Sequence, residues 1–330
     1  MTASANELNQ VSQVEEFLRQ NPEFLAQVQA KAEANRVKMA FRQARPLKLA
    51  SVDQPQLLLT AERIEKARQW ISGNSWSPAL SNPLETAFYA RVMDSVDHSR
   101  AAIDRLNSFV LSEQELAAVA SDNYRWSDWP PVVFDWVYRD MTEDERSVFR
   151  NRYGRYVDIM RTKTWGGPGM PASNYFHGYF RNELNWAAAI QPEMPEYADE
   201  LFNGIITERI NSLKGFYDGN GKGGCPLEGH QYGVCALGYY WLPMLFYPDL
   251  GWDFEGEFNW FREAVYWLNA ATLYGGSYPM IYPFGDAEDD GGFPQAGNPF
   301  FADFMAAMKI KYDSQLVGYA ASEWLVLTGA

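Results

Sequence analysis

A long succession of helical patterns, interrupted by glycine- and proline-rich loops, limits what this chain can fold into. Apolar residues recur at helical spacing over most of the sequence. No alternating pattern persists long enough to indicate a sheet. We expect further helices near residues 84–111, 174–190, 197–217, 228–246, 257–273 and 299–327. The sequence therefore predicts an all-α fold.

Several predicted helices begin at residues suited to that position. Thr60 precedes one helical pattern as an N-cap candidate. Pro130 and Pro131 stand where a helix start tolerates proline. Thr142 is followed by Glu-Asp-Glu, and acids in a first turn interact favourably with the helix dipole. That helix is predicted to reach about Arg161.

Ten or more helices joined by loops predict helical hairpins stacked side by side. A closed (α/α) toroid, or incomplete α/α barrel, would gather the loops at its rims. An open α-solenoid is the alternative architecture, although no regular repeat motif is visible. We expect residues 1–50 to form an N-terminal helical extension and residues 51–330 to form the toroid domain.

Composition narrows the classes of partner. Hydrophobic residues make up 47% of the chain, which is enough for a sizeable core. The net charge of −14 argues against a nucleic-acid partner, because phosphate binding needs basic patches. No apolar run approaches the length of a transmembrane helix, so we expect no membrane partner. The first ten residues lack the basic and apolar regions of a signal peptide, which leaves localisation open.

Metal and cofactor sites are not expected. Cys225 and Cys235, with His230 between them, fit no standard zinc spacing, and buried free thiols are the favoured interpretation. The acidic run Asp286–Asp290 offers oxygen ligands for calcium but lacks the spacing of an EF-hand loop. A solvated acidic loop is the preferred interpretation there.

Two polar segments are candidates for a functional site. Gly223-Gly-Cys-Pro-Leu-Glu-Gly-His-Gln-Tyr232 is a glycine loop predicted to run into a helix that opens with an acid, an imidazole and a phenol. About fifty residues upstream, Ser173-Asn-Tyr-Phe-His177 opens another helix in the same way. The chain also carries 12 Trp, a residue type that stacks on sugar rings as well as filling cores. These features point to a carbohydrate-active site.

Five motifs, in order, resemble those of heparinase II/III-like and alginate-lyase-like polysaccharide lyases. They are Asp53-Gln-Pro-Gln-Leu-Leu-Leu-Thr, Phe134-Asp-Trp-Val-Tyr-Arg-Asp-Met-Thr-Glu-Asp-Glu-Arg, Asn174…His177, Gly224-Cys-Pro-Leu-Glu-Gly-His-Gln-Tyr232 and Tyr282-Pro-Phe-Gly-Asp286. The first motif departs from the family, which usually has His where this chain has Gln54. The resemblance covers roughly residues 52–290.

The resemblance implies an α/α toroid that cleaves an acidic polysaccharide or oligosaccharide containing uronate by β-elimination. It also implies a C-terminal β-sandwich domain that closes over the cleft, which this sequence does not contain. The chain is then a fragment, an excised toroid, or a relative that has lost catalysis. No cofactor is implied.

The chemistry of elimination assigns roles to three residues. Removing the proton beside a carboxylate becomes feasible when the charge of that carboxylate is neutralised. We expect Asn174 to neutralise it, His177 to neutralise it or act as the base, and Tyr232 to transfer the proton. Their structural alternatives are an N-cap for Asn174, and packing for His177 and Tyr232.

Six further residues are predicted to touch substrate. Glu228 and Tyr232 are four apart, so on a helix they would share one face, where Glu228 could orient Tyr232. Arg181 would add positive potential one turn beyond His177. His230 is expected near the loop mouth. The candidate sugar-stacking residues are Trp126, Trp129 and Trp165.

Two other functions stay open. A glycoside hydrolase on an α/α barrel would use a pair of carboxylates on either side of the scissile bond. The sequence offers Asp135, Glu183, Glu228 and Asp286 for that pair. A non-catalytic carbohydrate-binding toroid is the remaining alternative.

Overall fold

A computed structural model describes residues 57–229, 232–274, 279–281 and 299–329. The chain divides into two compact units, Met1–Leu47 and Lys48–Ala330, and every described residue belongs to the second. Several predicted features lie outside the described residues: the extension 1–50, residues 53–56 of the first motif, His230, and the last motif and the acidic loop within 282–290.

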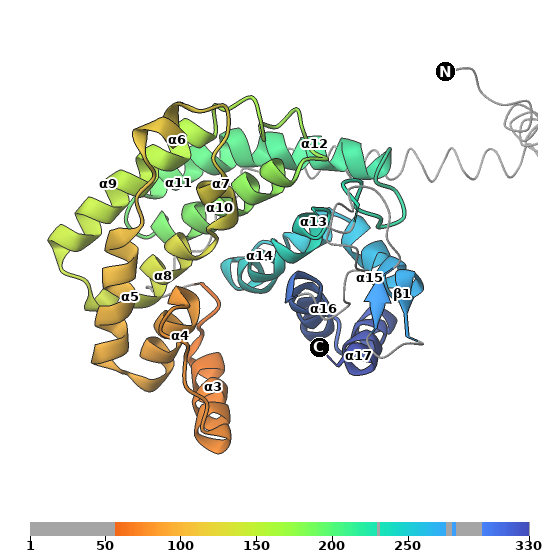
Figure 1. Ribbon diagram of the computed structural model, residues 1–330, viewed down its shortest axis with the longest axis horizontal. Coiled ribbons are helices and arrows are strands. Elements are labelled where there is room, and N and C mark those ends of the chain that lie inside the picture. The colour runs from red at the N-terminus through yellow and green to blue at the C-terminus, as the bar shows by residue number, and fades with distance from the viewer. Residues whose placement is uncertain (1–56, 230–231, 275–278, 282–298, 330) are drawn as a thin grey trace, which may run out of the picture. The chain divides into compact units, whose positions relative to one another are not determined.

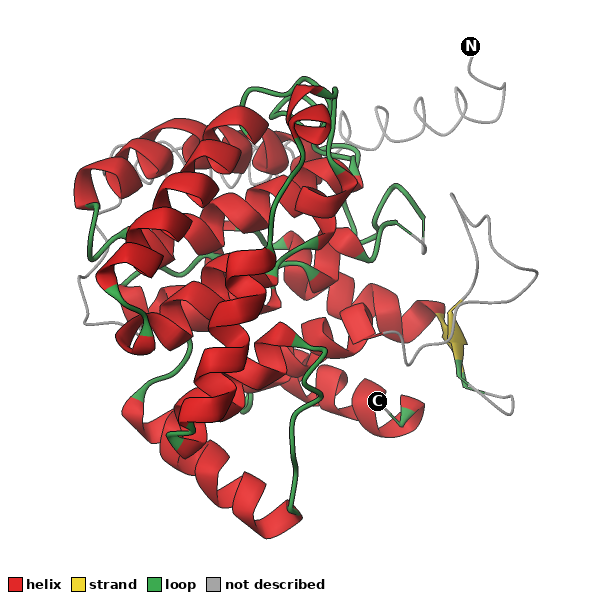
Figure 2. Ribbon diagram, turned by 60° about the vertical axis from the view of Figure 1, so that its left-hand side comes forward, coloured by secondary structure: helices red, strands yellow, loops and turns green. Residues whose placement is uncertain are grey.

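The predicted all-α class is confirmed: the described residues are mostly helical (Figures 1 and 2). The helices are α3 (Ala61–Asn74), α4 (Pro83–Met93), α5 (Val96–Ser108), α6 (Glu113–Ala117), α7 (Asp122–Trp126), α8 (Trp129–Val137), α9 (Glu143–Met160), α10 (Asn174–Ile190), α11 (Pro195–Leu201), α12 (Thr207–Asp218), α13 (Cys235–Gly238), α14 (Trp241–Phe246), α15 (Trp260–Ala271), α16 (Pro299–Lys311) and α17 (Leu316–Thr328). Within the described part, the only strands are β1 (Thr272–Leu273) and β2 (Met280–Ile281), paired antiparallel. None of the described helices has both the length and the apolar character needed to cross a membrane.

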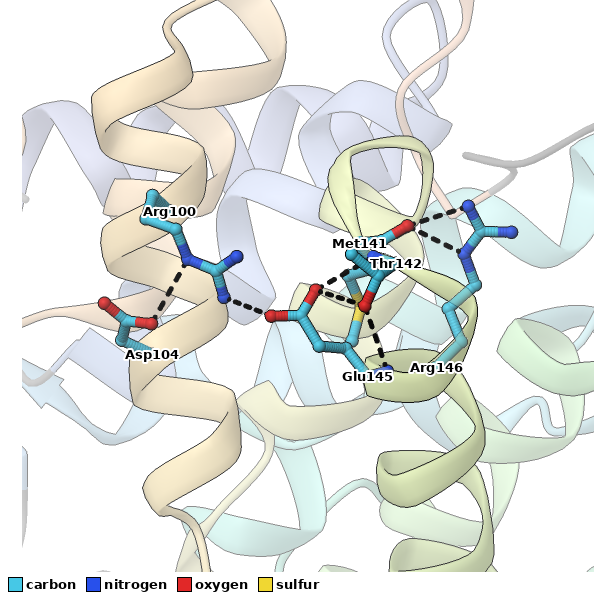
Figure 3. A network of polar contacts seen from close by, with 6 residues as sticks. All are labelled: Arg100, Asp104, Met141, Thr142, Glu145 and Arg146. Carbon is cyan, nitrogen blue, oxygen red and sulfur yellow. Dashed lines mark hydrogen bonds and ion pairs between the residues drawn. The ribbon is translucent and has the colours of Figure 1, made fainter.

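The predicted start of α9 is confirmed in detail. The Thr142 hydroxyl accepts from the Glu145 backbone N–H at 3.3 Å, and the Glu145 carboxylate accepts from the Thr142 backbone N–H at 2.8 Å. This reciprocal pair is a capping box. Arg100 of α5 donates to the same Glu145 at 2.7 Å, so the cap also joins two helices (Figure 3). The cap thus fixes both the start of α9 and its contact with α5.

Two predicted helices are interrupted. The segment 84–111 forms α4 and α5, separated at Asp94, which adopts a left-handed conformation with φ of 53°. The segment 197–217 forms α11 and α12, joined through a π-helical stretch in which Gly204 has non-helical backbone angles. Left-handed and broken conformations of this kind end regular helix geometry. The apolar spacing continues across each break, and for that reason it does not reveal the break.

The predicted helix over 228–246 is wrong in its first part, because regular helix begins only at Cys235. Gly229 has a φ of 76°, in the left-handed region. A Cβ on Gly233 would lie 1.9 Å from the Gly229 carbonyl oxygen, so the chain folds back on itself more tightly than any other residue allows. Glu228 and Tyr232 therefore do not share a helix face. The prediction that Glu228 orients Tyr232 from such a face is wrong.

Helix α10 lies at the centre of the packing. Every one of its residues except Tyr175 is buried, and it contacts α7, α8, α9, α11 and α13. Several of its polar side chains are paired with other elements, and Asn182 donates to the Tyr124 carbonyl of α7 at 2.6 Å. Glu183 accepts from Arg209 of α12 at 2.6 and 2.9 Å. Buried charges need such partners, so α10 fixes the positions of α7 and α12.

The Glu183–Arg209 pair gives a test of this packing. We expect Glu183→Gln to destabilise the domain by about 3–5 kcal/mol, because it leaves the Arg209 guanidinium buried without its counter-ion. Denaturant unfolding followed by circular dichroism measures the change. Glu62→Gln, which removes the exposed 2.6 Å pair with Lys66, is the control and should leave the midpoint unchanged. Equal effects of the two substitutions would contradict the central role of the buried pair.

Candidate functional site

The two polar segments meet at the N-terminus of α10. The backbone N–H of Asn174 donates to Glu228 Oε2 at 2.5 Å. The Ser173 hydroxyl caps the helix by accepting from the Tyr175 N–H at 3.2 Å. A carboxylate beside free N–H groups at a helix N-terminus is electrostatically stabilised. Glu228 thereby anchors its part of the glycine loop beside Asn174.

Arg125 occupies the centre of this meeting point. Its Nη1 donates to the Asn174 side-chain oxygen Oδ1. Its guanidinium carbon lies 4.1 Å from the ring centroid of Tyr175, 4.4 Å from that of Trp126 and 5.8 Å from that of Tyr232. The residue is only 6% exposed. One cation thus joins the predicted residues Asn174 and Tyr232, and it is held among aromatic faces that attract positive charge.

The position of Arg125 follows from a close approach of α7 to α10. A Cβ on Gly178 would lie 2.7 Å from the Arg125 carbonyl oxygen, so only glycine lets the two backbones come this near. Arg181 Nη2 donates to the same carbonyl at 2.7 Å. Through this bond the buried Arg181 side chain holds the backbone of Arg125 in position.

The remaining contacts of Arg181 are internal. Its guanidinium carbon lies 4.0 Å from the ring centroid of Tyr239, and its Nη1 lies 3.8 Å from Asp128. At 2% exposure, the Arg181 side chain holds other protein groups in place and presents almost no surface to a ligand.

His177 is also buried, at 2% exposure, and its Nδ1 shares a 2.8 Å hydrogen bond with the Tyr240 hydroxyl. Burial, and then the positive charge of Arg209, lowers the pKa of His177 to about 3. The imidazole is therefore neutral near pH 7. In this conformation it contacts core groups and is closed to solvent.

The three candidate tryptophans differ in their surroundings. Trp126 is 41% exposed and Trp165 is 47% exposed. Trp126 faces Arg125, and Trp165 contacts Tyr175 edge-on at 6.2 Å between ring centroids, so both border the Arg125 cluster. Trp129 is half-buried and packs edge-on against Phe109 at 5.4 Å. The first two are thus available as stacking surfaces beside the cluster.

Two of the carboxylates considered for glycoside hydrolysis are buried in the core, where they bind other protein groups. Asp135 is fully buried and accepts from the Leu57 N–H at 2.9 Å. Glu183 is fully buried against Arg209. Neither reaches solvent, so neither can flank a glycosidic bond. Asp286 lies outside the described residues.

The cysteines are both free thiols; Cys235 is buried and Cys225 is half-buried. Burial raises the pKa of Cys235 to about 12, which keeps its thiol protonated. Within the described part of the chain, no group of three His, Cys, Asp or Glu residues is arranged to hold a metal ion.

Sequence reasoning missed Arg125 and Tyr175. Arg125 lies 49 positions before Asn174, and nothing in helical spacing connects the two. The available signal was local: Tyr124-Arg-Trp126 combines a cation with aromatic residues in a short segment before Pro130 and Pro131.

The chain matches no protein-family model, and no curated protein sequence matches it.

The low pKa of His177 predicts an acid-dependent loss of stability. The folded pKa of about 3 is below the value of about 6.5 for a free histidine, so between these values the unfolded state binds the extra proton. This contribution is fully present above about pH 6.5 and is lost as pH falls toward 3, by at most about 1.4 kcal/mol per pH unit. We expect His177→Gln to flatten the slope of unfolding free energy between pH 6 and about 4. An unchanged slope would show that His177 does not govern this acid sensitivity.

Proposed function

We propose that this protein is a polysaccharide lyase that cleaves a uronate-containing glycan by β-elimination on an (α/α) toroid. The observation that carries the proposal is the contact of one buried cation, Arg125, with both Asn174 and the ring of Tyr232. Elimination needs a group that neutralises a carboxylate beside a group that moves a proton. The resemblance of the motifs to polysaccharide lyases adds independent support.

In the proposed mechanism, Arg125 and Asn174 hold the uronate carboxylate. The Tyr232 phenolate oxygen takes the proton from the carbon that bears the carboxylate, and the C–H electron pair moves into the carboxylate. The electrons return to form a carbon–carbon double bond as the bond to the glycosidic oxygen breaks. Tyr232 then gives its proton to that oxygen. The Arg125 charge stabilises the enolate that develops on the carboxylate.

The other predicted residues take supporting roles in this proposal. Trp126 and Trp165 supply stacking surfaces for neighbouring sugars. Glu228 positions the glycine loop, and Arg181 positions Arg125. Because His177 is neutral and closed to solvent, we assign it to holding Tyr240 rather than to proton transfer. His230 keeps the role of a substrate contact, and a β-sandwich following the toroid remains part of the proposal.

Tyr232→Phe tests the proposed proton transfer. The variant keeps the ring over Arg125 but lacks the hydroxyl, so we expect kcat to fall by about 100-fold or more with the circular dichroism spectrum unchanged. The assay is the rise in ultraviolet absorbance of the unsaturated uronate product, with alginate, heparan sulfate, chondroitin and hyaluronan as substrates. Tyr319→Phe, on the exposed face of α17, is the matched control and should retain full activity. Retained activity in Tyr232→Phe would remove Tyr232 from the mechanism.

One observation favours glycoside hydrolysis as a second candidate. Asp303 of α16 is accessible to solvent, yet partial desolvation and then the negative charge of Asp128 raise the pKa of its carboxyl to about 6. Below about pH 6 a protonated Asp303 would lie in the field of the negative charge of Asp128, and hydrolases use such a pairing as general acid and base or nucleophile. In the hydrolase hypothesis, Asp303 and Asp128 therefore take the place of the buried Asp135 and Glu183.

The products separate the two candidates. A hydrolase releases saturated reducing ends without a gain in ultraviolet absorbance. Its rate should fall as pH rises through about 6, because Asp303 then loses the proton that it would donate. Asp303→Asn should abolish such an activity and leave an elimination activity in place. Ultraviolet-absorbing products that require Tyr232 would reject the hydrolase.

A further inference from the structure

An internal carboxylate already sits on the Arg125 guanidinium. Arg125 Nη2 lies 2.6 Å from Asp122 Oδ1. The Tyr175 hydroxyl donates to the same oxygen at 2.7 Å. A guanidinium from α7 and a phenol from α10 thus converge on a single carboxylate oxygen.

The two partners of the ion pair differ greatly in their freedom to move. The Arg125 side chain is 8% exposed, whereas the Asp122 side chain is 66% exposed. Arg125 is further held by Asn174 and by the surrounding rings. Asp122 can rotate into water because its side chain is two-thirds exposed, but its departure leaves the buried Arg125 guanidinium without a counter-ion, so another carboxylate is favoured in its place over an empty site. The donors are therefore fixed, and their present acceptor is replaceable.

Tyr175 is a dependable donor in this arrangement. Desolvation, and next the hydrogen bond to Asp122, raises the pKa of Tyr175 to about 12, so its hydroxyl keeps its proton at neutral pH. The planar guanidinium beside it matches the geometry of a carboxylate better than a point charge would. Trp126 and Tyr175 bound the cation on their ring faces, which excludes water from it.

We propose that Arg125 and Tyr175 form a carboxylate-binding site, that Asp122 occupies it in the free protein, and that a sugar carboxylate binds by displacing Asp122. The identity of the ligand as a uronate rests on the proposed function. The site itself rests on the contacts of these three residues. Asp122 thereby keeps the buried cation paired until substrate arrives and weakens the apparent affinity for every carboxylate ligand.

The consequence is a competition between an internal and an external carboxylate. The apparent dissociation constant for a ligand rises by the inverse of the fraction of protein whose site is vacant. Asp122→Asn keeps the size of the side chain and removes its charge, which raises that vacant fraction. Tyr175→Phe removes one of the two donors and leaves the ring over Arg125 in place.

Binding of sodium glucuronate at low salt, measured by isothermal titration calorimetry, tests the proposal. We expect Asp122→Asn to bind the probe about tenfold more tightly than the unmodified protein. Asp104→Asn is the matched control, because Asp104 is an equally exposed acid paired with Arg100 at 3.2 Å on α5. It makes the same change in net charge and should alter the affinity by less than about twofold. Tyr175→Phe should bind more weakly than the unmodified protein.

Unchanged or weaker binding by Asp122→Asn would overturn the inference, as would binding equal to that of Asp104→Asn. Absence of binding by every variant, with folding verified by circular dichroism, would overturn it too. An elimination assay separates this failure from that of the proposed function. Tighter binding by Asp122→Asn without elimination on any glycan rejects the lyase and retains the site. Elimination with a KM that Asp122→Asn leaves unchanged retains the lyase and rejects the displacement of Asp122.

Discussion

The burial of α10 is the constraint on which the rest of the domain depends. Polar side chains on a helix as deeply buried as α10 need partners from other elements, and the amide of Asn185 is an exception that has none among the described residues. Arg181 and Asn182 meet this requirement with backbone carbonyls of α7, and Glu183 meets it with Arg209 of α12. These bonds fix the neighbours of α10 as firmly as apolar packing does. The candidate site follows from them, because α7 carries Arg125.

The same constraint explains how an acidic protein can hold a local positive site. The net charge is −14, and long-range attraction for a polyanion is therefore absent. Arg125 nevertheless presents a cation in a water-poor setting, where each short-range contact is stronger than at an open surface. Asn174 and the aromatic faces hold the guanidinium in one orientation. If the proposed anion binds here, contact geometry would hold it, with little contribution from steering.

Local sequence signals predicted the helices well and the site incompletely. The acids that follow Thr142 predict the start of α9 through the helix dipole, and the structure adds a capping box between Thr142 and Glu145, which are neighbours in sequence. The failure at 228–234 has a local cause too: Gly229 and Gly233 permit a fold-back that apolar spacing does not register. Arg125 was missed because the contacts that join it to Asn174 and Tyr232 come from α10 and from the glycine loop. Contacts between distant segments leave no trace in the spacing of one segment.

The convergence of the Ser173 and Gly223 segments illustrates what a single sequence can and cannot provide. The sequence identifies both segments as polar, but only the Ser173 segment begins a helix, and the bond from the Asn174 N–H to Glu228 joins the two. Glu228 was expected to act through a helical face shared with Tyr232, and it acts through the N-terminus of another helix. The carboxylate satisfies a helix end that would otherwise be unpaired. Glu228 thus has a structural partner at the start of α10, and Tyr232 of the same segment contacts the cation that binds Asn174.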